Sequence, residues 1–112
     1  MSTRATIKFT GFDGIQAIIY QHMDGYPEGE HGVKAVLEHF FAANEDTYGR
    51  DTRYDDPSYL AARFVGFLYN TGHAEDGLGV GIVAEDPSDI AYTYEVICNG
   101  EYRPAVGTYA VI

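Results

Sequence analysis

Apolar and polar residues alternate at the start of the chain. Residues 5–9 (ATIKF) repeat with the period of two that is typical of a half-buried strand. Residues 10–14 (TGFDG) carry two glycines and an aspartate, which indicates a turn, and residues 15–23 (IQAIIYQHM) predict a second strand. Because the turn is short, the two strands should form an antiparallel hairpin.

A helical period follows a loop over residues 24–32 (DGYPEGEHG). Five apolar residues fall on one helical stripe: Val33, Val36, Leu37, Phe40 and Phe41. This stripe predicts a helix over residues 32–43 that ends near Asn44. The polar residues 44–56 show no periodicity and predict a long loop.

A second helix should start at Pro57, with Asp55 or Asp56 as its cap, because proline suits the first helical position. Its buried stripe consists of Leu60, Phe64, Phe67 and Leu68. Gly72 is a suitable residue to end this helix.

Three further strands are predicted over residues 78–84, 90–98 and 102–112, with turns at 85–89 and 99–101. Pro104 and Gly107 favour an edge position or a bulge for the last strand. Strands at both ends and helices in the middle favour the α+β class. We therefore expect a single domain over residues 1–112, with one antiparallel sheet of four to five strands and two helices on one face.

Acidic residues dominate the charge, with 17 Asp and Glu against seven Lys and Arg and a net charge of −10. Direct binding of nucleic acid needs Lys and Arg, so this charge argues against it and favours basic partners. The 39 residues from 64 to 102 contain no Lys or Arg. Seven acids occur there: Glu75, Asp76, Glu85, Asp86, Asp89, Glu95 and Glu101.

Cysteine usage and hydropathy bear on the compartment. Cys98 is the one cysteine, so no intrachain disulfide can form, and its apolar surroundings predict a buried thiol. The start of the chain shows no signal-peptide pattern, and no apolar run is long enough for a membrane span. We expect a soluble, cytoplasmic protein with no membrane partner.

Polar residues cluster in the loop after the second strand: His22, Asp24, Tyr26, Glu28 and His31. They could bind a small ligand or a metal, but the spacing of the two histidines matches no common zinc or calcium motif. Asp24-Gly25 and Tyr26-Pro27 instead suit turns, and acids suit the entrance of a helix. We expect no metal and no cofactor here.

Catalytic patterns are weak elsewhere in the chain. The carboxylate pairs Asp55-Asp56 and Glu75-Asp76 lie in polar segments, which disfavours the burial that acid–base catalysis needs. The glycine-rich residues 77–81 lack the lysine and following helix of a phosphate loop. The sequence therefore predicts a protein that is not an enzyme.

Residues 44–56 interleave acids with tyrosine and arginine, types that are enriched at protein interfaces. A solvated loop explains the same composition. The candidate partner-binding residues in this segment are Asp46, Tyr48, Asp51, Tyr54, Asp55 and Asp56.

A resemblance adds to these expectations. Thr3, Arg4, Ile7 and Phe9, followed by residues 20–29 (YQHMDGYPEG), resemble a group of small phage, prophage and other mobile-element proteins over roughly the first 70 residues. Met23 stands where that group often has an aromatic residue. The resemblance implies a mobile-element origin and, for a phage-encoded protein, the host cytoplasm, but it carries over no catalytic residue.

These observations favour an acidic interaction protein that inhibits a host nucleic-acid-binding defence complex. The inhibitor would be of the anti-CRISPR or anti-restriction kind and would imitate the charge of DNA. Its predicted contacts are Glu75, Asp76, Glu85, Asp86 and Asp89, together with the acids of residues 44–56. Two alternatives stay open: a ligand- or metal-binding module or minor hydrolase centred on His22–His31, and a homo-oligomer, such as a homodimer, paired through residues 102–112.

Overall fold

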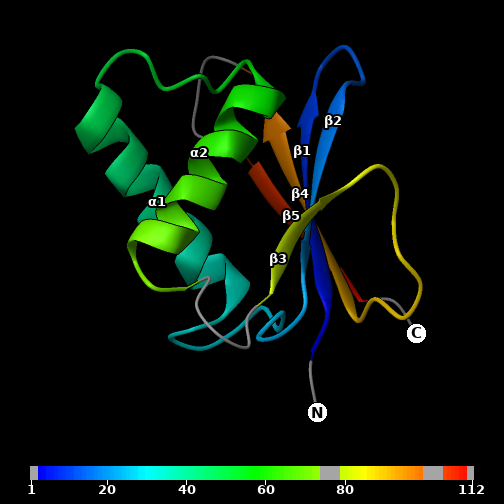
Figure 1. The fold of residues 1–112 in the computed structure, drawn as a ribbon. Coiled ribbons are helices and arrows are strands. Elements are labelled where there is room, and N and C mark those ends of the chain that lie inside the picture. The colour runs from blue at the N-terminus through cyan, green and yellow to red at the C-terminus, as the bar shows by residue number, and fades with distance from the viewer. Residues whose placement is uncertain (1–2, 74–78, 100–104, 111–112) are drawn as a thin grey trace.

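The computed structural model describes residues 3–73, 79–99 and 105–110. Its elements follow in the order β1 (Ala5–Gly11), β2 (Gln16–Gln21), α1 (Val33–Tyr48), α2 (Pro57–Asn70), β3 (Val80–Val83), β4 (Tyr92–Cys98) and β5 (Ala105–Ala110). The α+β class and the predicted order of strands and helices are confirmed. Figure 1 shows both helices on one side of the sheet.

The sheet has the strand order β3-β2-β1-β4-β5 and is mixed. β1 pairs with β2, β2 with β3, and β4 with β5, all antiparallel, but β1 and β4 are parallel. The expectation of a purely antiparallel sheet is therefore wrong. β5 lies at an edge, as predicted. Of the turn predicted at 99–101, residues 100 and 101 lie outside the described residues, and so does Pro104.

The reason for the parallel pair is the segment between β3 and β4. Residues 85–89 look like a hairpin turn in the sequence, but residues 84–91 run back across the sheet, so that β4 starts beside the start of β1. The backbone N–H of Ala91 donates to the carbonyl of Arg4 at 2.9 Å. We call residues 84–91 the strap; it lies on the side of the sheet opposite the helices (Figure 1).

The strap covers the helix-free face of the sheet. Thr6 and Ile18 point to that face, because their neighbours Ile7 and Ile19 belong to the core beneath the helices. Thr6, Ile18 and, from the strap, Ile90 are all buried, and none of the three belongs to the main core cluster. The sheet is therefore buried on both faces around β1, by helices on one side and by the strap on the other.

The main core lies between the sheet and the helices. Phe9 of β1 packs against Phe64 of α2, and Phe64 against Phe40 of α1, with ring centroids 5.6 and 5.2 Å apart. The first ring pair is tilted and the second is edge-on, and aromatic contacts of this kind stabilise the core beyond the burial of apolar area. The predicted apolar stripes of both helices are thus confirmed, although Phe67 is only partly buried.

The first helix is longer than the sequence predicts. α1 continues through residues 44–48, which were expected to be loop, and ends at Tyr48, where Gly49 has a positive φ of 59°. Asn44 is buried on the same stripe as Phe40 and Phe41. Because Asn44 is polar although it lies on the buried stripe, a pattern of apolar residues does not predict that the helix continues.

The loop between β2 and α1 is a backbone structure that closes the start of the helix. Gly32, the N-cap, makes no side-chain cap bond. Instead, the carbonyls of Tyr26 and Pro27 accept from the N–H groups of Val33 and Lys34, at 2.9 and 3.4 Å. The loop thus supplies acceptors for donors that the helix itself leaves unpaired.

Gly25 fixes the other end of this loop. Its N–H donates to the carbonyl of Thr3 at 2.9 Å, and its carbonyl accepts from the buried hydroxyl of Tyr94. A Cβ placed on Gly25 would lie 2.6 Å from the Cβ of Ala5 and 2.7 Å from the carbonyl oxygen of Thr3. The loop can approach β1 this closely because residue 25 has no side chain.

Replacing Gly25 with alanine should therefore lower the free energy of unfolding by about 1–3 kcal/mol, because β1 must move to admit the methyl group. Gly66→Ala is the matched control, because a Cβ on Gly66 meets nothing within 4 Å and alanine favours the exposed helix. The control should raise the free energy of unfolding by about 0.5–1 kcal/mol. Urea unfolding measures both, and equal effects of the two variants would contradict the packing at Gly25.

Candidate functional site

The predicted acidic contacts fall into two groups that lie on opposite sides of the sheet. Glu85, Asp86 and Asp89 belong to the strap, whereas Asp46 and Asp56 belong to the helical layer. Glu75 and Asp76 lie outside the described residues. The structure therefore does not bring the predicted acids together on one face, and a flat partner surface cannot cover both groups.

Asp86 holds the strap to the sheet. Its carboxylate accepts from Lys8 Nζ at 2.6 Å and from the hydroxyl of Thr6 at 3.3 Å. The Lys8 side chain is 19% exposed and that of Asp86 is 47% exposed, so the pair contributes about 1 kcal/mol or less. Asp86 is thus partly neutralised, while Glu85 and Asp89 are exposed.

Glu95 extends this acidic surface onto the sheet. It lies beside Lys8 in the register of β1 and β4, on the helix-free face, and its carboxylate accepts from the Thr10 hydroxyl at 3.4 Å. We call Glu85, Asp86, Asp89 and Glu95 the strap patch. Of the described basic residues, Lys8 belongs to the neighbouring strand β1 and Arg4 directly precedes that strand, and Lys8 is paired with Asp86.

The second group of acids lies at residues 46–56, where α1 ends and α2 begins, and is interleaved with arginines. We call this segment the helical end. Asp51 lies 3.7 Å from Nη2 of Arg63 and 2.9 Å from Nε of Arg53, the latter without the alignment of a hydrogen bond. Arg63 also donates to the carbonyl of Asp51 at 2.7 Å and stacks over the ring of Tyr48 at 3.5 Å. A guanidinium with this many partners joins the end of α1 and the following loop to α2.

The remaining residues of the segment divide between structure and surface. Asp56 caps α2, and the backbone N–H of Tyr59, at 3.2 Å from its carboxylate, holds the pKa of Asp56 below its usual value. Tyr54 is buried: it packs edge-on against Phe41 and donates to Glu45 at 3.0 Å. Tyr54 therefore cannot serve as the predicted partner contact, whereas Asp46 and Asp55 are exposed.

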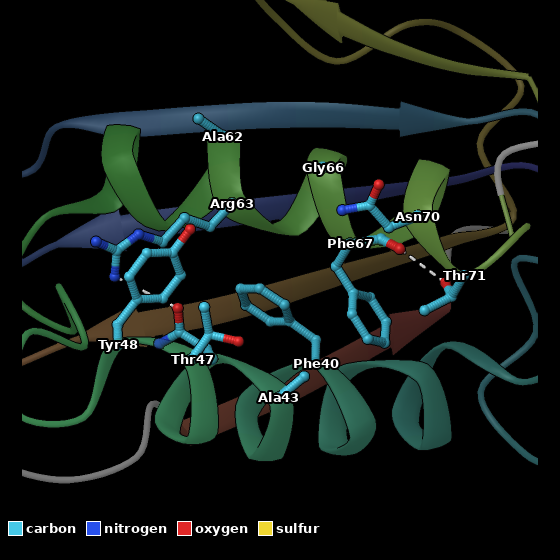
Figure 2. A pocket seen from close by; sticks show the side chains of 11 residues that line it. Phe40, Ala43, Thr47, Tyr48, Ala62, Arg63, Gly66, Phe67, Asn70 and Thr71 are labelled. Atoms are coloured by element: carbon cyan, nitrogen blue, oxygen red, sulfur yellow. Dashed lines mark hydrogen bonds between the residues drawn. The ribbon is translucent and has the colours of Figure 1, made fainter.

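A groove of about 520 Å³ lies between α1 and α2, next to this segment. Figure 2 shows Phe40 and Phe67 between the two helices, with Arg63 and Tyr48 at one end and Asn70 and Thr71 at the other. Because Arg63 already binds Asp51 and Tyr48, its guanidinium braces the helices and does not point a free charge into the groove.

The predicted ligand loop is largely structural. The backbone N–H of His22 donates to the carbonyl of Gly79, directly before β3, at 2.9 Å, and its Nδ1 lies 2.7 Å from the Tyr20 hydroxyl. Asp24 has a positive φ of 58°, and Glu28 pairs with Lys34 at 3.3 Å. Tyr26 and His31 are exposed.

No metal centre forms within the described part of the chain, where no three His, Cys, Asp or Glu side chains are arranged to hold an ion. The same described residues contain no helix long and apolar enough to cross a bilayer.

Cys98 is buried and ends β4 on the core side of the sheet. Burial raises the pKa of its thiol to about 11, so the nucleophilic thiolate is scarce at neutral pH. The predicted buried thiol is confirmed, and the surroundings are those of a packing residue.

Comparison with known proteins gives no further assignment: the chain matches no family model, no curated protein and no solved structure. The similarity to mobile-element proteins therefore stays a prediction from the residues at 3–29.

Sequence reasoning missed two functions of charged and polar residues. It grouped Asp86 with the partner contacts, but Lys8 and Thr6, about 80 residues away, turn Asp86 into an anchor. It also missed Arg63 and Asn44 as the link between the helices. The signal for Asn44 was its place on the stripe of Phe40 and Phe41.

Asn44→Ala should lower the free energy of unfolding by about 1–2 kcal/mol, because two hydrogen bonds of the buried Asn44 side chain are lost. Its amide donates to the carbonyl of Thr52 at 3.0 Å and accepts from Arg63 at 3.4 Å. Asn70→Ala, at an exposed position of α2, is the control. Urea unfolding checks both, and an Asn44→Ala variant as stable as the control would contradict the link.

Cys98 should react with a thiol reagent at pH 8 at least about 100-fold more slowly in the folded than in the urea-unfolded protein. Burial raises the pKa of the Cys98 thiol to about 11, so at pH 8 the folded protein keeps this thiol protonated. In the unfolded protein a larger fraction of the thiol is ionised at the same pH. Because the thiol has a higher pKa in the folded than in the unfolded protein, its contribution to stability is fully present below the pKa of the unfolded thiol. This contribution is lost as the pH rises toward 11. The absorbance of the thiolate that the reagent releases measures both reaction rates. Comparable rates in the folded and the unfolded protein would show that the Cys98 thiol is accessible in the fold.

Proposed function

We propose that this protein is a non-enzymatic, acidic interaction module that binds a basic surface of a host nucleic-acid-handling complex. The partner would be a CRISPR or restriction complex, and the protein would inhibit it by occupying a channel that otherwise holds DNA. One observation carries the proposal: the strap patch lies in a stretch of 39 residues that has no Lys or Arg.

The strap patch suits this function better than the helical end. Glu85 and Asp89 are exposed and have no basic residue within their own segment, whereas Asp51 at the helical end is shared between Arg53 and Arg63. Charges that are not neutralised within the chain generate the field that steers a basic partner. The helical end contributes at most Asp46 and Asp55 as exposed carboxylates.

The fold holds the acids of the strap in fixed positions on the sheet. Ile90 of the strap is buried, and Asp86 is bonded to Lys8 and Thr6, so the acids on either side are held against the sheet. A preordered set of charges loses less conformational entropy on binding than a free loop does.

Glu85→Gln combined with Asp89→Asn and Glu95→Gln should weaken binding to a purified CRISPR surveillance complex or a restriction endonuclease by about tenfold or more. The matched control, Asp46→Asn with Asp55→Asn, should change the affinity less than threefold, since these acids lie on the other side of the sheet. Calorimetry over a salt series measures both, because an exposed charge-driven contact weakens as salt rises.

Asp86 is left unchanged in the test variant because its loss would loosen the strap. Binding that does not depend on salt, or no binding to either complex, would overturn the proposed function.

A further inference from the structure

The outer edge of β3 is an open strand edge beside the strap. Within the described residues 3–73, 79–99 and 105–110, β3 is the last strand of the sheet on this side and pairs with β2 alone. Edge strands with unpaired backbone groups are templates for a further strand.

The register shows which backbone groups are free. His22 donates to the carbonyl of Gly79 across the β2–β3 pair, which makes these two residues a hydrogen-bonded pair. In an antiparallel ladder such pairs alternate with non-bonded pairs, so Gly81 and Val83 also bond to β2. The N–H and C=O groups of Val80 and Ile82 therefore point away from β2, toward the open edge.

The side chains at this edge fit an apolar contact. Ile82 is 78% exposed although it pairs directly with the core residue Ile19. Among the described residues, no backbone hydrogen bond outside the sheet involves Val80 or Ile82. The edge thus offers both main-chain hydrogen bonds and one large apolar side chain.

The charge around the edge selects the occupant. β3 lies within the stretch that has no Lys or Arg, and the exposed Glu85 follows it almost at once. A second copy of this chain would bring a further net charge of −10 to the same place. An extended segment in which apolar residues alternate with Lys or Arg would bring complementary charge.

We propose that β3 binds an extended basic segment of a partner protein as an additional strand, with the N–H and C=O groups of Val80 and Ile82 as its main-chain contacts. An apolar residue of the partner packs on Ile82, and its basic residues lie toward Glu85 and the strap. The charge of this partner rests on the proposed function, whereas the geometry of the strand rests on the register of β3.

The test uses the full chain, labelled with nitrogen-15, and a synthetic peptide of alternating valine and lysine. Two matched peptides accompany it: one N-methylated at the residues that would donate to β3, and one with glutamate in place of lysine. The valine–lysine peptide should slow the hydrogen exchange of the Val80 and Ile82 amides, and N-methylation should weaken its binding about tenfold or more, since it keeps the charge and removes the donors.

Two variants of the protein complete the test. Ile82→Pro should weaken peptide binding about tenfold or more, because it removes an N–H that β2 does not use, and proline is tolerated at such edge positions. Ile82→Val keeps that N–H and an apolar side chain, and its binding should stay within about threefold of that of the unmodified chain.

The outcomes distinguish a failure of strand addition at β3 from a failure of the proposed basic partner. Equal binding of the N-methylated peptide, or unchanged exchange at Val80 and Ile82, would overturn strand addition and leave the charge proposal standing. Equal binding of the valine–glutamate peptide would overturn the basic partner and the proposed function, and leave strand addition standing. A dimer in sedimentation that Ile82→Pro dissociates would show that a second copy occupies the edge and would overturn the basic segment as its occupant.

Discussion

The fold depends on the close contact between Gly25, the start of β1 and the hydroxyl of Tyr94. Tyr94 is fully buried, burial raises the pKa of its hydroxyl, and the hydrogen bond to the Gly25 carbonyl satisfies it there. A buried hydroxyl without a partner would cost free energy, so β4 and the loop hold each other in place. Since the same loop supplies the acceptors for the start of α1, this one contact relates the centre of the sheet to the helical layer.

The net charge gives an incomplete picture of the surface. Several acids are used within the chain: Asp86 anchors the strap, Asp56 caps a helix, and Asp51 binds arginines. The charge that remains for a partner is what the fold leaves unpaired. On the helix-free face, Glu85 follows the edge strand β3 closely in the sequence, so in the proposed complex electrostatic attraction and main-chain pairing would act on the same partner.

Local patterns predicted most of the elements but not their long-range pairing. The hairpin of β1 and β2 followed from alternation and from the turn at Gly14, whose φ of 87° needs glycine. The strap escaped prediction because residues 85–89 have the composition of a tight turn, and only their contacts with Thr6 and Lys8 show a crossover. Likewise, the acids could be counted from the sequence, but their division between two sides of the sheet depends on the topology.

The parallel pairing of β1 with β4 has a consequence for how the chain is made. Thr6 meets Thr93 across this pair, at a sequence separation of 87. During synthesis, the hairpin of β1 and β2 and both helices emerge long before β4 exists to complete the centre of the sheet. Until then, one side of β1 has no strand beside it, and pairing over such a sequence separation is slow. β1 thus leaves the ribosome before the other strands of this sheet but gains its second neighbour only with β4, and until then the nascent chain exposes one of its edges to other strands.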